Sequence, residues 1–214
     1  MDIRAAPVSM PYVDDHCIVA IKPAGLLSVP GRGPQHRDCL ALRVQLRHAD
    51  ALVVHRLDMA TSGLMLLARG SAAQRRLSMS FASRDVEKTY VAVVDGRIAD
   101  DAGEIALPLV ADWPNRPRQI VDHGRGKPAL TRYRVLHRDA ETRRTRVELS
   151  PVTGRSHQLR VHLQALGHPI LGDALYAPAH VHAAADRLLL HAAALRFPHP
   201  ATEATIRFDS PAPF

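Results

Sequence analysis

The sequence is poor in the residues and motifs on which many cofactor, metal and membrane sites depend. Its two cysteines, Cys17 and Cys39, form no CxxC pair, which argues against a disulfide framework and a cysteine-based zinc site. The chain has no phosphate-binding P-loop, dinucleotide fingerprint, serine-hydrolase elbow or HExxH zinc motif. No apolar run approaches the ~18 residues of a membrane span, and the first residues hold no signal-peptide core. We therefore expect a cytoplasmic protein with no membrane contact.

Aromatic residues and lysines are also scarce, whereas arginine is abundant. Aromatics make up only 4% of the chain, which disfavours a surface that stacks many bases in a row. The basic residues are 25 arginines and 3 lysines, and the formal net charge is +7. A GC-rich genome explains the arginine-to-lysine ratio equally well, but it does not explain the positive surplus. That surplus indicates a polyanionic partner, with nucleic acid as the first candidate.

The length of 214 residues predicts a single domain over residues 1–214, with a short N-terminal extension at residues 1–13. Apolar periodicity and turn residues predict the following helices: Cys39–His48, Gly70–Phe81 and Ser156–Gly167. They predict the following strands: one that starts at Cys17, Leu52–His55, Gly63–Ala68, Lys88–Gly96, Thr131–Leu136, Thr145–Leu149, Arg187–Phe197 and Ala204–Phe208. Because strands outnumber helices and their order is mixed, we expect an α+β fold. Its central sheet should be mixed, largely antiparallel and flanked by helices.

Two helices have a predicted buried face, and one segment is predicted to be irregular. In the first helix Leu40, Val44 and Leu46 are expected to face inward, and in the last one Leu159, Leu163 and Leu166 share a face. The segment Asp112–Gln119 carries two prolines and is expected to be irregular.

A lone carboxylate, Asp58, follows an apolar segment and precedes another in the stretch HRLDMATSGLMLLAR. A buried carboxylate is costly unless it is paired, and Arg56 lies two residues away on the same side of an extended chain. A second basic cluster with Arg155 and Arg160 offers another partner, which would keep Asp58 ionised and oriented. The alternative is purely structural: Asp58 caps a turn that continues through Thr61.

The thirteen histidines do not form a metal-ligand pattern. Their spacings are irregular, and His157 and His162 are five residues apart, which places them on different sides of a helix. We therefore expect no metal site.

The stretch around Asp58 closely resembles the catalytic motif of the RluA family of pseudouridine synthases. Other segments match in the family's order. DDHCIVAIKPAGLLSVPG resembles its opening segment, EKTYVAVVDG its second motif, GRSHQLRVHLQALGHPILGDALY its third and RLLLHAAAL its closing one. The resemblance covers Asp14 to about Leu195 and implies the pseudouridine synthase fold. Only about a dozen residues precede the first motif, so the N-terminal S4 domain of many relatives is not expected.

The resemblance assigns roles to four residues. It implies that Asp58 is the catalytic carboxylate, that Tyr90 belongs to the catalytic set, and that Arg160 pairs with Asp58. It also implies that Arg56 fills the gap left by a flipped nucleotide. The remaining substrate-binding residues are expected to be Arg155, as a phosphate ligand, with Thr61 and Leu159.

The implied reaction breaks the N1–C1′ bond of a uridine, turns the base and rejoins it through C5. Asp58 either attacks the sugar or base, or removes the 2′ proton, and the sequence leaves both routes open. No metal or organic cofactor is required. The segments DWPNRP and GHPILGDALYA indicate the branch of the family that acts on both tRNA and 23S rRNA. We expect a monomer without an obligatory protein partner.

Three alternatives remain. The enzyme acts on only one of these RNAs, or the chain is a non-catalytic RNA-binding module, or it is a nucleoside or glycoside hydrolase. A hydrolase needs a second acid, and the nearest candidates before Tyr90 are Asp85 and Glu87, both expected to face solvent.

Overall fold

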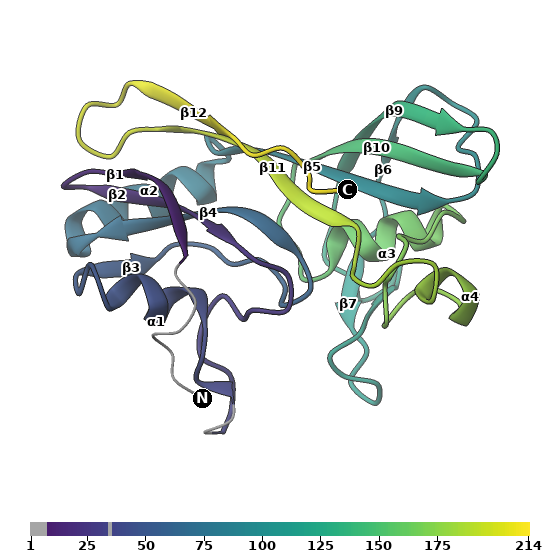
Figure 1. The fold of residues 1–214 in the computed structure, drawn as a ribbon, viewed down its shortest axis with the longest axis horizontal. Helices are drawn as coiled ribbons and strands as arrows, with labels where there is room; N and C mark the ends of the chain where they lie inside the picture. Colours follow the sequence, from purple (N-terminus) through teal and green to yellow (C-terminus); the bar gives the residue numbers. More distant parts are fainter. Residues whose placement is uncertain (1–7, 34–35) are drawn as a thin grey trace. The chain divides into compact units, whose positions relative to one another are not determined.

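The computed structural model describes residues 8–33 and 36–214, in which the chain divides into two compact units (Figure 1). The first unit comprises the chain up to Lys88 together with Ala192–Pro213, and the second comprises Thr89–His191 with Phe214. Strands outnumber helices, which confirms the expected α+β class. The single domain over residues 1–214 stays a prediction, and residues 1–7 of its expected extension lie outside the described residues.

The first unit contains the strands β1 (Ser9–Val13), β2 (Cys17–Lys22), β3 (Ala51–Val53), β4 (Ser62–Arg69), most of β11 (Leu190–Pro198) and β12 (Thr205–Asp209). Its helices are α1 (Leu40–Gln45) and α2 (Gly70–Ser83). β2 pairs antiparallel with both β1 and β4, β3 pairs antiparallel with β4, and β11 pairs antiparallel with β12. The described part of the expected N-terminal extension is therefore an ordered strand, β1.

Strands β2 and β4 are buried on both faces, because one helix covers each face. Ile18 of β2 packs in a cluster with Leu40 and Val44 of α1, whereas the next residue, Val19, packs in a cluster with Leu77 of α2. This alternation follows from the pleat of the strand. It also explains the continuous apolar run of β4, because neither side of that strand faces water.

Two expectations for this unit need correction. Leu46 was expected to face inward, but 57% of its surface is exposed, because α1 ends at Gln45 and Leu46 lies beyond its apolar face. The strand expected over Leu52–His55 is instead Ala51–Val53. From the end of β3 onward, side chains take part in the hydrogen bonding of this region. Gln74 of α2 donates to the carbonyl of Val53, and the imidazole of His55 accepts the N–H of Leu66.

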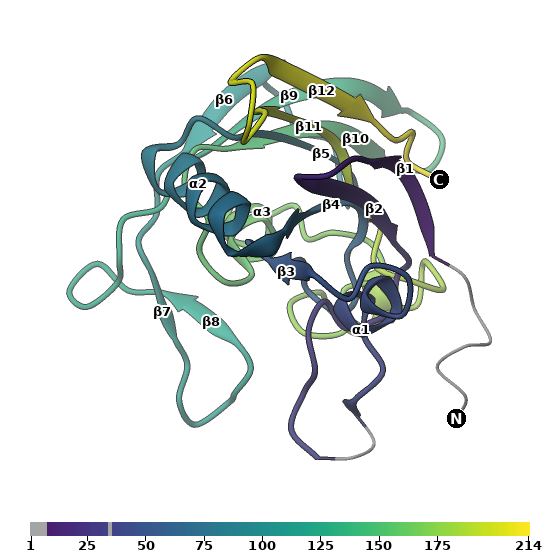
Figure 2. The ribbon, with the colours of Figure 1, turned by 90° about the vertical axis from the view of Figure 1, so that its left-hand side faces the viewer.

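The second unit contains most of β5 (Glu87–Asp95) and the strands β6 (Ala102–Ile105), β7 (Leu109–Ala111), β8 (Gln119–Val121), β9 (Thr131–Asp139) and β10 (Arg144–Pro151). Its helices are α3 (Gln158–Ala165) and α4 (Ala179–His182). β5, β10, β9 and β6 are neighbours in that order, and each adjacent pair is antiparallel. β7 and β8 form a separate antiparallel pair, which lies apart from β6 and β9 in Figure 2. The irregular segment expected at Asp112–Gln119 is the loop of this hairpin, with its last residue in β8.

Helix α3 is buried on more than its apolar side. Leu159 and Leu163 are buried as expected, but Leu166 is 38% exposed, because the helix ends one residue before it. Arg160 and His162 are also buried. His162 is held by the hydroxyl of Thr131 at 2.9 Å and by a backbone carbonyl at 3.0 Å. Buried polar groups need such partners, so α3 is fixed on several sides. Among the described residues, no helix is long and apolar enough to span a membrane.

Candidate active site

Asp58 lies in the loop between β3 and β4, in the first unit, where it is half-buried. Its backbone carbonyl accepts a hydrogen bond from the backbone N–H of Thr61 at 3.1 Å. Thr61 is buried, whereas Arg56 is exposed. The turn of the structural alternative is therefore present in the backbone. This hydrogen bond is accepted by the backbone carbonyl, so it leaves a chemical role for the carboxylate open.

The two residues that flank Asp58 are held by the last residue of β2 and by the segment that follows this strand. The hydroxyl of Ser28 donates to the carbonyl of Leu57 at 2.6 Å and accepts from the N–H of Leu57 at 3.0 Å. On the other side, the carbonyl of Met59 accepts from the ammonium of Lys22 at 3.0 Å. Asp58 is thus fixed from both neighbours, which is how a reacting group is pre-organised.

Lys22 is completely buried, and its ammonium donates hydrogen bonds to three backbone carbonyls. Besides Met59 it donates to Pro23 at 2.8 Å and to Leu26 at 2.7 Å. A buried charge is stable only when such partners surround it. Composition and spacing gave no sign of this role, although Lys22 lies within the opening segment KPAGLLS of the family resemblance.

His55, three residues before Asp58, is a neutral structural residue. Its Nε2 accepts the N–H of Leu66 at 2.9 Å, and its ring stacks on Phe81 with centroids 4.6 Å apart. Burial lowers the pKa of His55 to about 3, and the nearby charge of Lys88 acts in the same direction. At neutral pH the ring carries no extra proton, so it does not act as an acid. It links the segment that follows β3 to β4.

Gly63 allows close approach of β4 to β11 just after the Asp58 loop. Its φ is +115°, and a Cβ there would lie 2.3 Å from the carbonyl oxygen of Ala192. Only glycine fits both the backbone conformation and the space.

Arg160 lies in α3 in the second unit and is 4% exposed. Its Nε and Nη2 donate to the two carboxylate oxygens of Asp173 at 2.8 Å and 2.6 Å. Asp173 also accepts the backbone N–H groups of Leu175 and Tyr176 at 2.9 Å and 3.1 Å. This bidentate geometry fixes the plane of the guanidinium. Sequence reasoning missed Asp173, whose only signal was its place in the GDALY part of the third motif.

Tyr176 connects this ion pair to the β7–β8 hairpin. Its hydroxyl accepts the backbone N–H of Gln119 at 2.8 Å and lies 2.6 Å from Nδ1 of His157. The guanidinium carbon of Arg160 lies 5.0 Å from the centre of the Tyr176 ring. His157 precedes α3 in a left-handed conformation, with φ of 54°. The sequence gave no indication of this contact.

The remaining predicted site residues also belong to the second unit. Tyr90 is half-buried in β5, opposite Leu149 of β10. Leu159 is buried beside Arg160. Arg155 is exposed, and its Nε donates to the carbonyl of Pro128 at 3.1 Å. The phosphate-binding role expected for Arg155 stays a prediction.

The predicted set is thus shared between the units. Asp58, Arg56 and Thr61 lie in the first unit, and the others lie in the second. The pairing of Arg160 with Asp58 stays a prediction.

Neither candidate second acid resembles a catalytic group. Asp85 and Glu87 are both exposed, as expected. Asp85 accepts a hydrogen bond from Ser83, and Glu87 pairs with Arg196. A glycosidase needs a second carboxyl group that acts on the scissile bond, whereas both of these exposed carboxylates already bind a neighbouring side chain.

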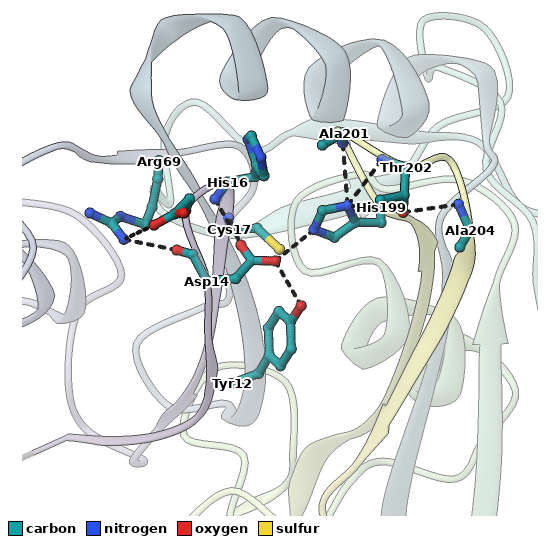
Figure 3. Close-up of polar contacts among 10 residues, drawn as sticks. Tyr12, Asp14, His16, Cys17, Arg69, His199, Ala201, Thr202 and Ala204 are labelled. Carbon is teal, nitrogen blue, oxygen red and sulfur yellow. Dashed lines mark hydrogen bonds and ion pairs between the residues drawn. The ribbon is translucent and has the colours of Figure 1, made fainter.

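A cluster that the sequence did not indicate lies in the first unit, between β1 and the end of β11 (Figure 3). One donor atom each of Asp14, Cys17 and His199 lies within 4.8 Å of the others, a spacing suited to a metal ion. However, the carboxylate of Asp14 already binds protein donors. It accepts from the Tyr12 hydroxyl and from Nε2 of His199, each at 2.7 Å, and from the backbone N–H groups of His16 and Cys17.

The protonation of the cluster also favours a structural role. Nδ1 of His199 accepts the N–H groups of Ala201 and Thr202 at 3.3 Å and 3.2 Å, so Nε2 carries the proton given to Asp14. Burial raises the pKa of the Cys17 thiol to about 12, with the charge of Asp14 adding to the effect. Burial alone would raise the pKa of Asp14, but its hydrogen bonds outweigh that effect and lower it well below its ordinary value. The cluster therefore joins β1 to the β11–β12 hairpin as a polar clasp.

Comparison with known protein families and sequences gives a consistent result. The model of the family described as RNA pseudouridylate synthase matches residues 16–165. The chain is 49% identical over 217 residues to the "Dual-specificity RNA pseudouridine synthase RluA" of Pasteurella multocida (strain Pm70), with 99% of each chain covered. It is 51% identical over 203 residues to the protein of the same name from Escherichia coli (strain K12), covering 95% of this chain and 92% of that one.

Two solved structures share the fold. "Human RNA Pseudouridylate Synthase Domain Containing 1" matches with a TM-score of 0.82 and 28% identity, over 100% of this chain and 86% of that one. "Human RNA Pseudouridylate Synthase Domain Containing 4" matches with a TM-score of 0.76 and 26% identity, over 96% of this chain and 88% of that one.

Proposed function

The chain belongs to the RNA pseudouridylate synthase family, and on that premise we propose that Asp58 is its catalytic carboxylate and that it modifies both tRNA and 23S rRNA. Membership makes the protein an isomerase that converts uridine in RNA to pseudouridine, on the pseudouridine synthase fold. Dual specificity appears in the names of its bacterial relatives. The assignment of tRNA and 23S rRNA as its two substrates rests on the resemblance of its sequence motifs to those of the family.

The observation that carries the proposal is the fixation of Asp58. Its loop is held on one side by Ser28 and on the other by Lys22, so the backbone of the half-buried Asp58 is held at both neighbouring residues. An isomerisation through C5 needs one carboxylate and no activated water. The exposed positions of Asp85 and Glu87 agree with that requirement and disfavour the hydrolase alternative.

The reaction balances without a co-reactant. The N1–C1′ bond breaks, the uracil turns, a C5–C1′ bond forms, and the proton on C5 is exchanged for one on N1. Asp58 either forms a covalent bond to the sugar or base, or removes the 2′ proton and later returns it. In this proposal Tyr90 supports the flat face of the base, and its hydroxyl, or a water beside it, accepts the C5 proton.

RNA recognition rests on the arginines. The target base must leave its stack to react, and RNA loops release a base at less cost than a duplex. The exposed Arg56 is placed two residues from Asp58, where it can refill the vacated space. Arg155, beside α3, is proposed as a phosphate ligand, and Arg160 as the orienting partner of Asp58. Thr61 and Leu159 complete the proposed substrate-binding set.

Release of tritium from RNA labelled at C5 of uridine tests the proposal. We expect release from a tRNA anticodon stem-loop and from a 23S rRNA hairpin. Asp58→Asn should reduce both rates below about a hundredth of wild type while RNA binding is retained, because the amide keeps the shape and loses the reactive charge. The matched control is Asp186→Asn, at an exposed carboxylate, which should leave both rates within about twofold.

Each result has a distinct reading. Release from only one RNA would support the alternative of single specificity. Free uracil among the products would indicate hydrolysis, and binding without release would indicate an RNA-binding module. Residual turnover of Asp58→Asn above about a hundredth would exclude Asp58 as the reactive group.

We also propose that the enzyme works as a cytoplasmic monomer without a metal, a cofactor or an obligatory protein partner. Light scattering of the purified protein tests the oligomeric state. Tritium release after dialysis against EDTA tests the metal independence, and a loss restored by zinc would contradict it.

A further inference from the structure

The loop of the β7–β8 hairpin is a closed and well-braced structure. At its base the N–H of Asp112 donates to the carbonyl of Arg118 at 3.0 Å. Inside it, the backbone and side-chain N–H groups of Asn115 bind the carbonyl and carboxylate of Asp112 at 3.1 Å and 2.9 Å. Pro114 and Pro117 further restrict the chain. A short loop built in this way holds its side chains in place before any partner arrives.

The loop presents the only tryptophan of the chain to solvent. Trp113 is 66% exposed, although tryptophan is highly buried on average in folded proteins. The guanidinium carbon of Arg116 lies 3.1 Å from the centre of its ring, so one face of the indole is covered by a cation. The large exposed fraction shows that much of the remaining ring surface is open.

The surroundings of the loop are basic. Arg118, Arg125 and Lys127 are exposed on the hairpin and on the segment that follows β8. Of the two carboxylates in this region, Asp112 is engaged inside the loop, and Asp122 pairs with Arg125 at 2.7 Å. An exposed aromatic ring among cations is the combination that binds single-stranded nucleic acid, by base stacking and phosphate contacts.

The hairpin is connected to Arg160, the proposed orienting partner of Asp58, within the same unit. The guanidinium carbon of Arg118 lies 5.5 Å from the centre of the Tyr176 ring, and that of Arg160 lies 5.0 Å from it. The Tyr176 hydroxyl also accepts the N–H of Gln119, the first residue of β8. A ligand on the loop is thereby held in a fixed relation to Arg160.

We propose that Trp113 and Arg116 form a binding site for one unpaired nucleotide of the substrate RNA, separate from the uridine that reacts. The base stacks on the open surface of the Trp113 indole, while Arg116 and Arg118 bind the adjacent phosphates. The site selects RNA loops that offer a second unpaired base in addition to the reacting uridine. This inference rests on the proposed function, because it identifies how that enzyme chooses its RNA.

The first test uses the fluorescence of Trp113, which is the sole tryptophan of the protein. Wild-type protein is titrated with an anticodon stem-loop that carries cytidine in place of the target uridine, so that it binds without turnover. We expect saturable quenching of the emission, with a midpoint that matches the affinity from filter binding. Saturated binding with unchanged emission would overturn the inference.

The second test compares kinetic constants for tritium release from the uridine stem-loop. Trp113→Ala should raise KM about ten- to a hundredfold, since stacking of one base is lost, and should change kcat by less than about threefold. Trp113→Phe should restore most of the loss. Met79→Ala is the matched control, because Met79 is 63% exposed on α2, and its KM should stay within about twofold.

The outcomes separate this inference from the proposed function. Tritium release by the wild type with equal KM for Trp113→Ala and Met79→Ala would overturn the Trp113 site and leave the activity intact. Quenching of Trp113 by RNA without tritium release would support the site and contradict the activity.

Discussion

Removal of the Ser28 hydroxyl should both destabilise the protein and slow its reaction, because that hydroxyl holds the residue next to Asp58. In Ser28→Ala the N–H and the carbonyl of Leu57 each lose their hydrogen bond to the hydroxyl, at 3.0 Å and 2.6 Å. Ser28 is 3% exposed and Leu57 is 6% exposed, so water has little access to replace the missing partner.

The magnitude follows from these two bonds. A hydrogen bond contributes about 1 kcal/mol net, and a buried group left without a partner costs about 1–3 kcal/mol. Together they predict a loss of about 3 kcal/mol in the free energy of unfolding. For a chain of this length that corresponds to a decrease in Tm of roughly 6–12 °C. Since a displacement of about 1 Å in a reacting group costs up to a hundredfold in rate, we expect kcat to fall at least about tenfold.

Urea titration gives the change in unfolding free energy, and tritium release at 25 °C gives kcat under conditions where the variant is folded. The control is Ser78→Ala, which removes an exposed hydroxyl on α2. Its unfolding free energy should change by no more than about 0.5 kcal/mol, and its kcat should be unchanged. If Ser28→Ala and Ser78→Ala gave the same midpoint and the same kcat, the proposed bracing of the Asp58 loop would be wrong.

Three further predictions test other contacts. Arg160→Ala should lower the free energy of unfolding by about 3–5 kcal/mol, because it leaves the Asp173 carboxylate buried without its bidentate partner. Arg155→Ala, at an exposed residue, should change it by less than about 1 kcal/mol, and equal urea midpoints would contradict this difference. Arg56→Ala should slow tritium release more on a folded stem-loop than on an unstructured strand of the same composition, since only the stem-loop has stacking to replace; equal losses would remove the base-flipping role. Asp14→Asn should destabilise the protein at pH 7, because the folded state lowers the pKa of this carboxyl group. That stabilisation is present above the unfolded pKa of about 3.9 and is lost as the pH falls toward the folded value, so the advantage of wild type in urea should shrink below about pH 4. An advantage that stays constant from pH 7 to pH 3 would exclude the carboxylate as its cause.

The polar contacts that stabilise the fold and the Asp58 loop were not predictable from the sequence, because they join residues without a fixed spacing. The clasp connects Asp14 to His199, which lie 185 positions apart, and Lys22 reaches Met59 over 37 positions. Helical or strand periodicity relates only near neighbours, so it carries no information about such pairs. Even the partner of Arg160, thirteen positions away, depends on the turn that brings Asp173 back to α3.

The sequence by itself determined the α+β class, most of the strands and helices, the pseudouridine synthase family and the candidate carboxylate Asp58. These features reside in local pattern: the apolar alternation of strands, the spacing of helical faces, and short motifs whose residue types are read in order. The tertiary structure decided which polar groups are buried and what satisfies them, as at Lys22, and which large side chain remains in solvent, as at Trp113. The physical reason is that burial is a property of packed surfaces, which distant segments create only after the chain has folded.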